Sequence, residues 1–343
     1  MIQQRIYWID NLKGFILLMV CFYHFALLCP FSIITGREGL LTLFFLSGYL
    51  FNENKYSTVK KYIKNKFKSL LLPYFTLSFL FALFPFSLKT DYIFASEWIH
   101  TFNFPINLEL YINTYIINTI DILQGYSFQD GTAPLWFVYT LFQVSILYYI
   151  INKISYEYIK FTLIIGCLCI GWYCNIHSIV LPFNLHTMFT SLFFYGLGHN
   201  SHMIVNRFNK LYIIIYFSFI YLLSYIKGGF FDLRINELGS SLFIFLLYTT
   251  SGIAFFISLF RYISQKDNII FGIFRNISRN ALIILSMHFY FAVLLSSLFD
   301  INYYVKLILI IICTIISIPI FRCYLYRLIG KEKISIKESL SIK

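Results

Sequence analysis

The sequence predicts an all-α protein, a polytopic bundle of about ten transmembrane helices with both termini in the cytoplasm. Hydrophobic residues make up 59% of the 343 residues and charged residues only 12%, whereas soluble domains carry about 25% charged residues. The apolar residues also gather in runs that approach the roughly 20 residues a helix needs to cross the hydrocarbon core. These two observations exclude an ordinary soluble domain.

The apolar runs place the expected spans in chain order. They lie near residues 14–34, 39–52, 69–87, 133–152, 161–176, 182–198, 211–227, 238–260, 280–299 and 304–322. With the N-terminus inside, 22 of the 27 Lys and Arg residues fall on the cytoplasmic side, as the positive-inside rule requires. The net charge of +12 is therefore a signal of topology, and no nucleic-acid partner is expected.

Between the spans, the longest external segment covers residues 88–132. It is acidic but rich in Ile, Tyr and Phe, which predicts amphipathic helices on the outer membrane surface. We therefore expect one transmembrane domain over residues 1–330, with a basic cytoplasmic tail over 331–343. The seven cysteines lack zinc-ligand spacing, so no metal site is expected.

The first span carries two titratable residues whose burial in a membrane costs free energy, Lys13 and His24. Eleven positions at 100° each return to within about 20° of the starting direction, so both side chains lie on one helical face, about 16 Å apart along the axis. A titratable side chain at membrane depth is by default a functional-site hypothesis. The alternative is that His24 packs against a neighbouring hydroxyl or carbonyl, and that Lys13 anchors the cytoplasmic end of the span.

Five motifs resemble the acyltransferase type 3 family of integral membrane O-acyltransferases, in its fucose 4-O-acetylase-like branch. Together they extend over residues 5–290. The motifs are Trp8-Ile-Asp10-Asn-Leu-Lys13-Gly14 followed by His24, Phe44-Phe45-Leu46-Ser47-Gly48-Tyr49, Leu72-Pro73-Tyr74, Pro134-Leu135-Trp136-Phe137, and Arg279-Asn280-Ala281 with His288.

The resemblance implies an O-acyltransferase of ten helices. Such an enzyme takes an acyl group, usually acetyl, from cytoplasmic acyl-CoA and delivers it to a hydroxyl of a surface polysaccharide or its lipid-linked sugar precursor. Acetyl-CoA is then the donor, and membrane lipids surround the protein. Abundant Ile, Asn, Lys, Phe and Tyr are typical of an AT-rich bacterial genome, so the bacterial cytoplasmic (inner) membrane is the expected location.

Acyl transfer needs a base for the hydroxyl proton and cations for the donor's phosphates. His24 is the expected general base, with a role as acyl-carrying nucleophile as the alternative. His288 lies at similar depth in the ninth span, so it is a second catalytic candidate or a packing residue. Lys13 is expected at the donor. Asp10, one turn earlier, is a candidate substrate contact or a partner for Lys13.

The family often carries an Arg-x-x-Arg pair just before its Leu-Pro-Tyr motif, thought to face the CoA phosphates. Here the corresponding residues are Lys66 and Ser69. Only Lys66 carries over, with Lys68 and Lys64 as expected substitutes. Lysine offers phosphate a point charge where arginine offers a bidentate fork, so the donor contact of this loop departs from the family pattern.

Three further residues are candidate substrate contacts with a structural alternative each. Ser47, beside Gly48, would otherwise serve close helix packing. Trp136 would otherwise belong to the outer aromatic belt, and Asn280 would otherwise cap a helix.

The competing class of protein is a transporter or flippase for a lipid-linked sugar or another small substrate, because polar residues inside a bundle also mark transport pathways. Transporters often contain paired halves with broken helices in matching positions, and the sequence has no such repeat. Consumption of acetyl-CoA distinguishes the two classes, because only the enzyme transfers or hydrolyses the thioester.

Overall fold

The protein is helical throughout the part that the computed structural model describes. The described segments are residues 6–24, 30–82, 87–88, 102–103, 108–126, 133–227, 231–298 and 302–335. Apart from helices and loops they contain one short antiparallel ladder, in which β1 (Ser87–Leu88) pairs with β2 (Phe102–Asn103). The predicted all-α class with several apolar helices is confirmed.

The helices follow the predicted order closely. The first group is α1 (Tyr7–His24), α2 (Pro30–Tyr49), α3 (Val59–Lys66), the π-helical turn η2 (Phe67–Leu71), α4 (Leu72–Ala82), α5 (Leu108–Gln124), α6 (Trp136–Asn152) and α7 (Glu157–Ile176). The second group is α8 (Leu185–Asn200), α9 (His202–Val205), α10 (Leu211–Ile226), α11 (Leu242–Ile263), α12 (Ile269–Arg279), α13 (Ala281–Leu298) and α14 (Tyr303–Pro319).

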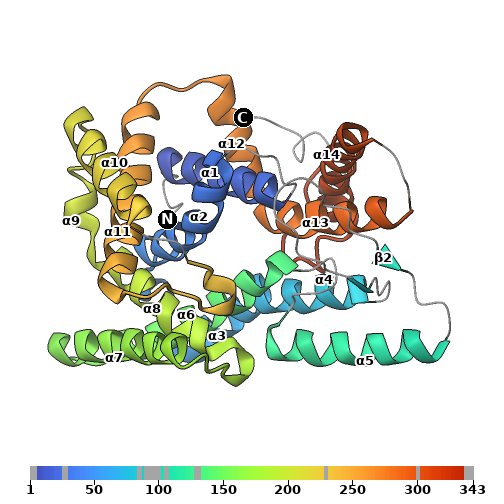
Figure 1. Ribbon diagram of the computed structural model, residues 1–343, viewed down its shortest axis with the longest axis horizontal. Coiled ribbons are helices and arrows are strands. Elements are labelled where there is room, and N and C mark those ends of the chain that lie inside the picture. Colours follow the sequence, from blue (N-terminus) through green and yellow to red (C-terminus); the bar gives the residue numbers. More distant parts are fainter. Residues whose placement is uncertain are drawn as a thin grey trace.

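Helices α1 and α2 occupy the centre of the molecule (Figure 1). The pair α10 and α11 lies on one side of them, and α13 and α14 lie on the other. Helix α1 packs against α2, α11, α12 and α13, and α2 packs against α8. The first helix is therefore surrounded by protein, which is the setting in which a polar side chain at membrane depth can be tolerated.

Three described helices are long and apolar enough to cross a membrane, namely Glu157–Ile176, Leu242–Ile263 and Tyr303–Tyr324. The helices Ile269–Arg279 and Ala281–Leu295 pass the same criteria only when taken together, and they are bent by 83° at the break between them, as in a broken span or a re-entrant loop. Shorter apolar helices include Trp136–Asn152 and Leu211–Ile226.

One predicted boundary is wrong. The apolar runs placed the end of the first span near residue 34 and the start of the second near residue 39, but α2 is one helix from Pro30 to Tyr49. Proline is favoured at the first position of a helix, where its missing N–H costs no hydrogen bond, so Pro30 marks a helix start. The external segment was expected to be helical, and α5 confirms this for residues 108–124. Most of its residues before α5 lie outside the described residues.

Backbone contacts between helices depend on glycine at two places. In α1, a Cβ atom added to Gly14 would lie 1.9 Å from the carbonyl oxygen of Phe274 in α12. In α2, a Cβ atom on Gly48 would lie 1.8 Å from the carbonyl oxygen of Tyr195 in α8. Small residues allow this approach, as is common between membrane helices. Both glycines belong to the motifs above, and their role here is packing.

Candidate functional site

Two histidines from different helices meet at the core of the molecule. His24 is the last residue of α1, and His288 is the eighth residue of α13. Their ring centroids are 5.5 Å apart with an interplanar angle of 43°. Phe289 covers the ring of His24 at 5.1 Å between centroids. The residues are 264 positions apart in the chain, so only the packing of α13 against α1 brings these two imidazoles together.

The protonation pattern of His288 follows from its surroundings. Its ring is 1% exposed, and its Nδ1 lies 2.6 Å from the carbonyl oxygen of Ile284, one turn earlier in the same helix. A carbonyl oxygen only accepts hydrogen bonds, so Nδ1 carries the proton and donates it. The neutral ring then has Nε2 as its basic nitrogen. The same pattern, a fixed tautomer with one basic nitrogen, is found in histidines that act in proton transfer.

Lys13, the seventh of the 18 residues of α1, lies about 16 Å from His24 along the helix axis. Lys13 is partly buried, and the charges of Asp10 and Lys331 both act on its ammonium group. The Asp10 carboxylate accepts a hydrogen bond of 3.4 Å from the Ser278 hydroxyl of α12. Asp10 therefore joins α1 to α12 at the level of Lys13.

Lys66, the last residue of α3, is partly buried, and the charge of Lys13 acts on its ammonium group. Burial, together with the charges of Lys13 and Lys55, lowers the pKa of Lys66 to about 8. Its Nζ lies 5.5 Å from the ring centre of Tyr62, and the Tyr62 hydroxyl donates a 3.1 Å hydrogen bond to the Ser145 carbonyl of α6. This anchored tyrosine holds the end of α3 against the bundle.

The other predicted loop cations differ from Lys66. Lys64 and Lys68 are exposed. Ser69, at the place of the second family arginine, donates a weak 3.5 Å hydrogen bond to the Lys66 carbonyl. The sequence placed three lysines at the donor without ranking them by geometry, and burial now separates Lys66 from the other two.

A third cation, Lys331, reaches the same region, and sequence reasoning assigned it only to a tail. The preceding residues are fixed: Ile329 is 1% exposed, and Gly330 has a φ of +63°. A Cβ atom on Gly330 would lie 1.9 Å from the Lys68 carbonyl oxygen. The C-terminal segment thus packs against the turn that follows Lys66. No local pattern in the sequence indicates this contact.

The three candidate substrate residues have structural contacts of their own. Ser47 donates a 2.7 Å hydrogen bond to the Leu43 carbonyl in its own helix. Trp136 begins α6 and is 4% exposed. Asn280 stands at the bend between α12 and α13, where its amide donates 3.1 and 2.8 Å hydrogen bonds to Asn276. Within the described segments, no group of three His, Cys, Asp or Glu side chains could hold a metal ion.

Comparison with known proteins identifies one family. Its model, described as an acyltransferase domain, matches residues 6–324. No curated protein and no solved structure matches the chain. The matched range includes both histidines and Lys66, and it ends before Lys331.

Proposed function

The chain belongs to the acyltransferase family whose model covers residues 6–324, and on this premise we propose that it transfers an acetyl group from cytoplasmic acyl-CoA to a glycan hydroxyl. The acceptor is a surface polysaccharide or its lipid-linked sugar precursor. The observation that carries the proposal is the contact between His24 and His288, 5.5 Å between ring centroids, on a helix that also carries Lys13, about 16 Å away along its axis. In CoA, the extended pantetheine arm separates the phosphates from the thioester by a distance similar to that between Lys13 and His24.

The reaction needs one proton to move twice. His24 accepts the proton of the acceptor hydroxyl as its oxygen attacks the thioester carbonyl. The carbon–sulfur bond breaks, and the leaving thiolate takes the proton back from the imidazolium, so the products are an O-acyl ester and free CoA. His288, with Nδ1 held by Ile284, offers its basic nitrogen to the acceptor hydroxyl or to His24. The alternative, an acyl group carried on His24, uses the same residues.

The donor's phosphates belong near Lys13, on the N-terminal side of His24 in α1. Lys13, Lys66 and Lys331 come from three segments of the chain and are coupled through their charges. Phosphate groups are stabilised by such clustered cations, and Lys64 and Lys68 on the surface would attract the anionic donor. Asp10, Ser47, Trp136 and Asn280 stay predictions as substrate contacts, with Asp10 and Asn280 favoured as positioning residues.

The proposed setting is a bacterial inner membrane crossed ten times, with both termini in the cytoplasm. The cytoplasmic donor then enters from the side of Lys13, and the acceptor reaches His24 from the side of the external loops. The fucose 4-O-acetylase-like branch is part of the same proposal.

Release of free CoA by the purified protein tests this function. We expect acetyl-CoA to be consumed when a hydroxyl-bearing glycan from the native host is added, with one ester formed for each CoA released. Measured thiol and ester-linked acetate should rise together. If acetyl-CoA is never consumed while lipid-linked sugars cross vesicles that contain the protein, the transporter class replaces the proposal.

The pKa of Lys66 predicts how donor binding depends on pH. Because its pKa lies near 8, Lys66 is charged at pH 7 and about nine-tenths neutral at pH 9. The donor phosphates, with a second pKa near 6, do not titrate in this range. We expect the KM for acetyl-CoA to rise up to about tenfold between pH 7 and pH 9.

Two variants act as controls for this pH dependence. Lys66→Arg should give a flat profile, because arginine stays charged. Lys331→Gln should raise KM at every pH and keep the slope, because Lys66 is still present. Lys66 does not contact the donor if the wild-type KM for acetyl-CoA does not change with pH. The same conclusion follows if Lys66→Arg shows the same rise of KM with pH as the wild type.

A further inference from the structure

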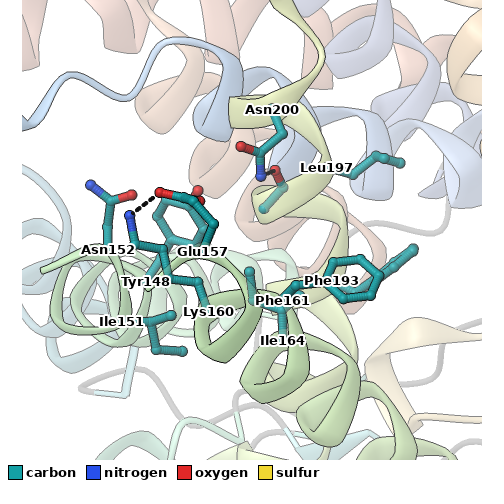
Figure 2. A pocket seen from close by; sticks show the side chains of 11 residues that line it. Tyr148, Ile151, Asn152, Glu157, Lys160, Phe161, Ile164, Phe193, Leu197 and Asn200 are labelled. Carbon is teal, nitrogen blue, oxygen red and sulfur yellow. Dashed lines mark hydrogen bonds and ion pairs between the residues drawn. The ribbon is translucent and has the colours of Figure 1, made fainter. Parts of the chain in front are cut away.

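A pocket of about 340 Å³ lies at the polar end of α7, away from the two histidines. The ends of α6 and α8 and the start of α7 line it. Figure 2 shows the polar side chains of Asn152, Glu157 and Lys160 gathered at one end, and the rings of Phe161 and Phe193 at the other. Its size is at the lower end of the range for ligand pockets. A pocket lined by both charged and aromatic side chains suits an amphiphile.

The charges of this pocket follow a fixed order along α7. Glu157 is the first residue of the helix, Lys160 lies about 4.5 Å further along the axis, and Ile164 lies about 10 Å along it. The Lys160 ammonium lies 2.7 Å from the Glu157 carboxylate, with side-chain exposures of 17% for Lys160 and 81% for Glu157. The carboxylate is thus the outer charge, the ammonium the inner one, and the apolar wall begins directly beyond it.

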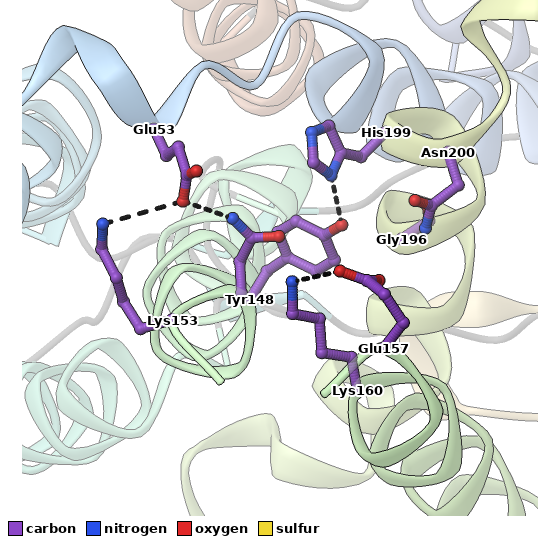
Figure 3. A network of polar contacts seen from close by, with 9 residues as sticks. Glu53, Tyr148, Lys153, Glu157, Lys160, Gly196, His199 and Asn200 are labelled. Atoms are coloured by element: carbon purple, nitrogen blue, oxygen red, sulfur yellow. Dashed lines mark hydrogen bonds and ion pairs between the residues drawn. The ribbon is translucent and has the colours of Figure 1, made fainter. Parts of the chain in front are cut away.

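The polar wall is held in place by its own hydrogen bonds. The Tyr148 hydroxyl lies 2.6 Å from Nδ1 of His199, and Glu53 lies 3.7 Å from the Lys153 ammonium (Figure 3). The Asn152 amide donates a 2.6 Å hydrogen bond to the same Glu53 carboxylate. The pocket is therefore preformed, which lowers the cost of binding.

The open side of the pocket faces the bilayer in the proposed arrangement. Helix α7 is one of the three described helices that are long and apolar enough to span a membrane. Near its polar end, Phe161 and Tyr158 are 67% and 68% exposed, as expected for aromatic residues at a membrane interface. Acyl chains can therefore pass from the pocket over Phe161 into the hydrocarbon.

We propose that this pocket binds the head group of one phosphatidylethanolamine-type phospholipid. In such a lipid the primary ammonium lies outermost, the phosphate beneath it and the acyl chains deepest. The pocket presents the complementary order: Glu157 for the ammonium, Lys160 for the phosphate, and Phe161 with Ile164 for the chains. A phosphatidylglycerol has the phosphate but lacks the ammonium, so it leaves Glu157 facing a net anion. The charge order therefore favours the zwitterionic lipid.

The test is competition between two lipids on the full-length protein. Purified protein is equilibrated in mixed micelles with equimolar phosphatidylethanolamine and phosphatidylglycerol of identical acyl chains, and bound lipid is counted by native mass spectrometry. We expect one phosphatidylethanolamine to be retained in preference, by about fivefold, which is the size of effect that one interfacial charge supplies. Equal retention of the two lipids, or no retained lipid, overturns the proposal.

Exchanging the charges of residues 157 and 160 distinguishes a lipid-binding role of Glu157 and Lys160 from a purely structural ion pair. The double variant Glu157→Lys with Lys160→Glu keeps the pair but reverses its order, so the preference for phosphatidylethanolamine should disappear. Glu157→Gln alone should shift the preference toward phosphatidylglycerol, and Lys210→Gln, at the start of α10, should leave it unchanged. Thermal unfolding in detergent confirms that each variant is folded. An undiminished preference in the exchanged variant contradicts the proposal.

Discussion

Replacing His24 with alanine is expected to lower the rate of acetyl transfer by at least about 100-fold, because general-base catalysis by a positioned side chain contributes about 10²–10⁴-fold. Alanine cannot accept the hydroxyl proton, and no part of the donor site changes. The KM for acetyl-CoA should therefore stay near its wild-type value while kcat falls. Initial rates of CoA release, with equal amounts of folded protein, provide the measurement.

The control for this variant is His177→Ala. His177 is exposed at the end of α7, so its loss should leave kcat unchanged. Incubating wild-type protein with acetyl-CoA alone distinguishes the two possible roles of His24. If His24 is an acyl-carrying nucleophile, the protein gains the mass of one acetyl group; if it is a general base, the mass does not change. Full activity of His24→Ala would exclude both roles.

Replacing Gly14 with alanine is expected to destabilise the protein by about 1–3 kcal/mol, the usual cost of overpacking. The added Cβ would lie 1.9 Å from the Phe274 carbonyl oxygen, and a backbone carbonyl within a helix cannot rotate away as a flexible side chain does. Helix α1 must then move away from α12, and it carries both Lys13 and His24. Thermal unfolding in detergent and the rate of CoA release should fall together.

Gly166→Ala in α7 is the matched control. A Cβ atom at Gly166 meets nothing within 4 Å, and alanine has the higher helix propensity, so this variant should be as stable as the wild type or slightly more stable. If both variants unfold at the same temperature as the wild type, the close contact of α1 and α12 is not a feature of the folded protein.

Continuous apolar runs made the main helices predictable. The span expected at 211–227 is α10 (Leu211–Ile226), and the span expected at 304–322 is α14 with the turn that follows it. In both cases the run is long, and charged or polar residues stand at its ends. By contrast, α12 was not predicted as a separate helix: its eleven residues mix apolar, basic and amide side chains, so hydropathy alone does not mark it.

The candidate site was predicted in parts. Periodicity placed Lys13 and His24 on one face, and depth placed His288 at a similar level, but their contact depends on how α13 packs against α1. Lys331 was assigned to the tail because the sequence contains no local signal that the chain returns to the Lys66 turn. That return depends on the burial of Ile329 and on the left-handed backbone of Gly330.

The central claim is that this protein places acyl esters on a glycan through His24. The most direct measurement is ester-linked acetate on the surface glycan of cells that lack the gene, complemented with wild type or with His24→Ala at equal membrane abundance. The account predicts that wild type restores the ester and His24→Ala does not. Restoration by both proteins would contradict the role of His24, and restoration by neither, with altered export of the glycan, would contradict the acyltransferase itself.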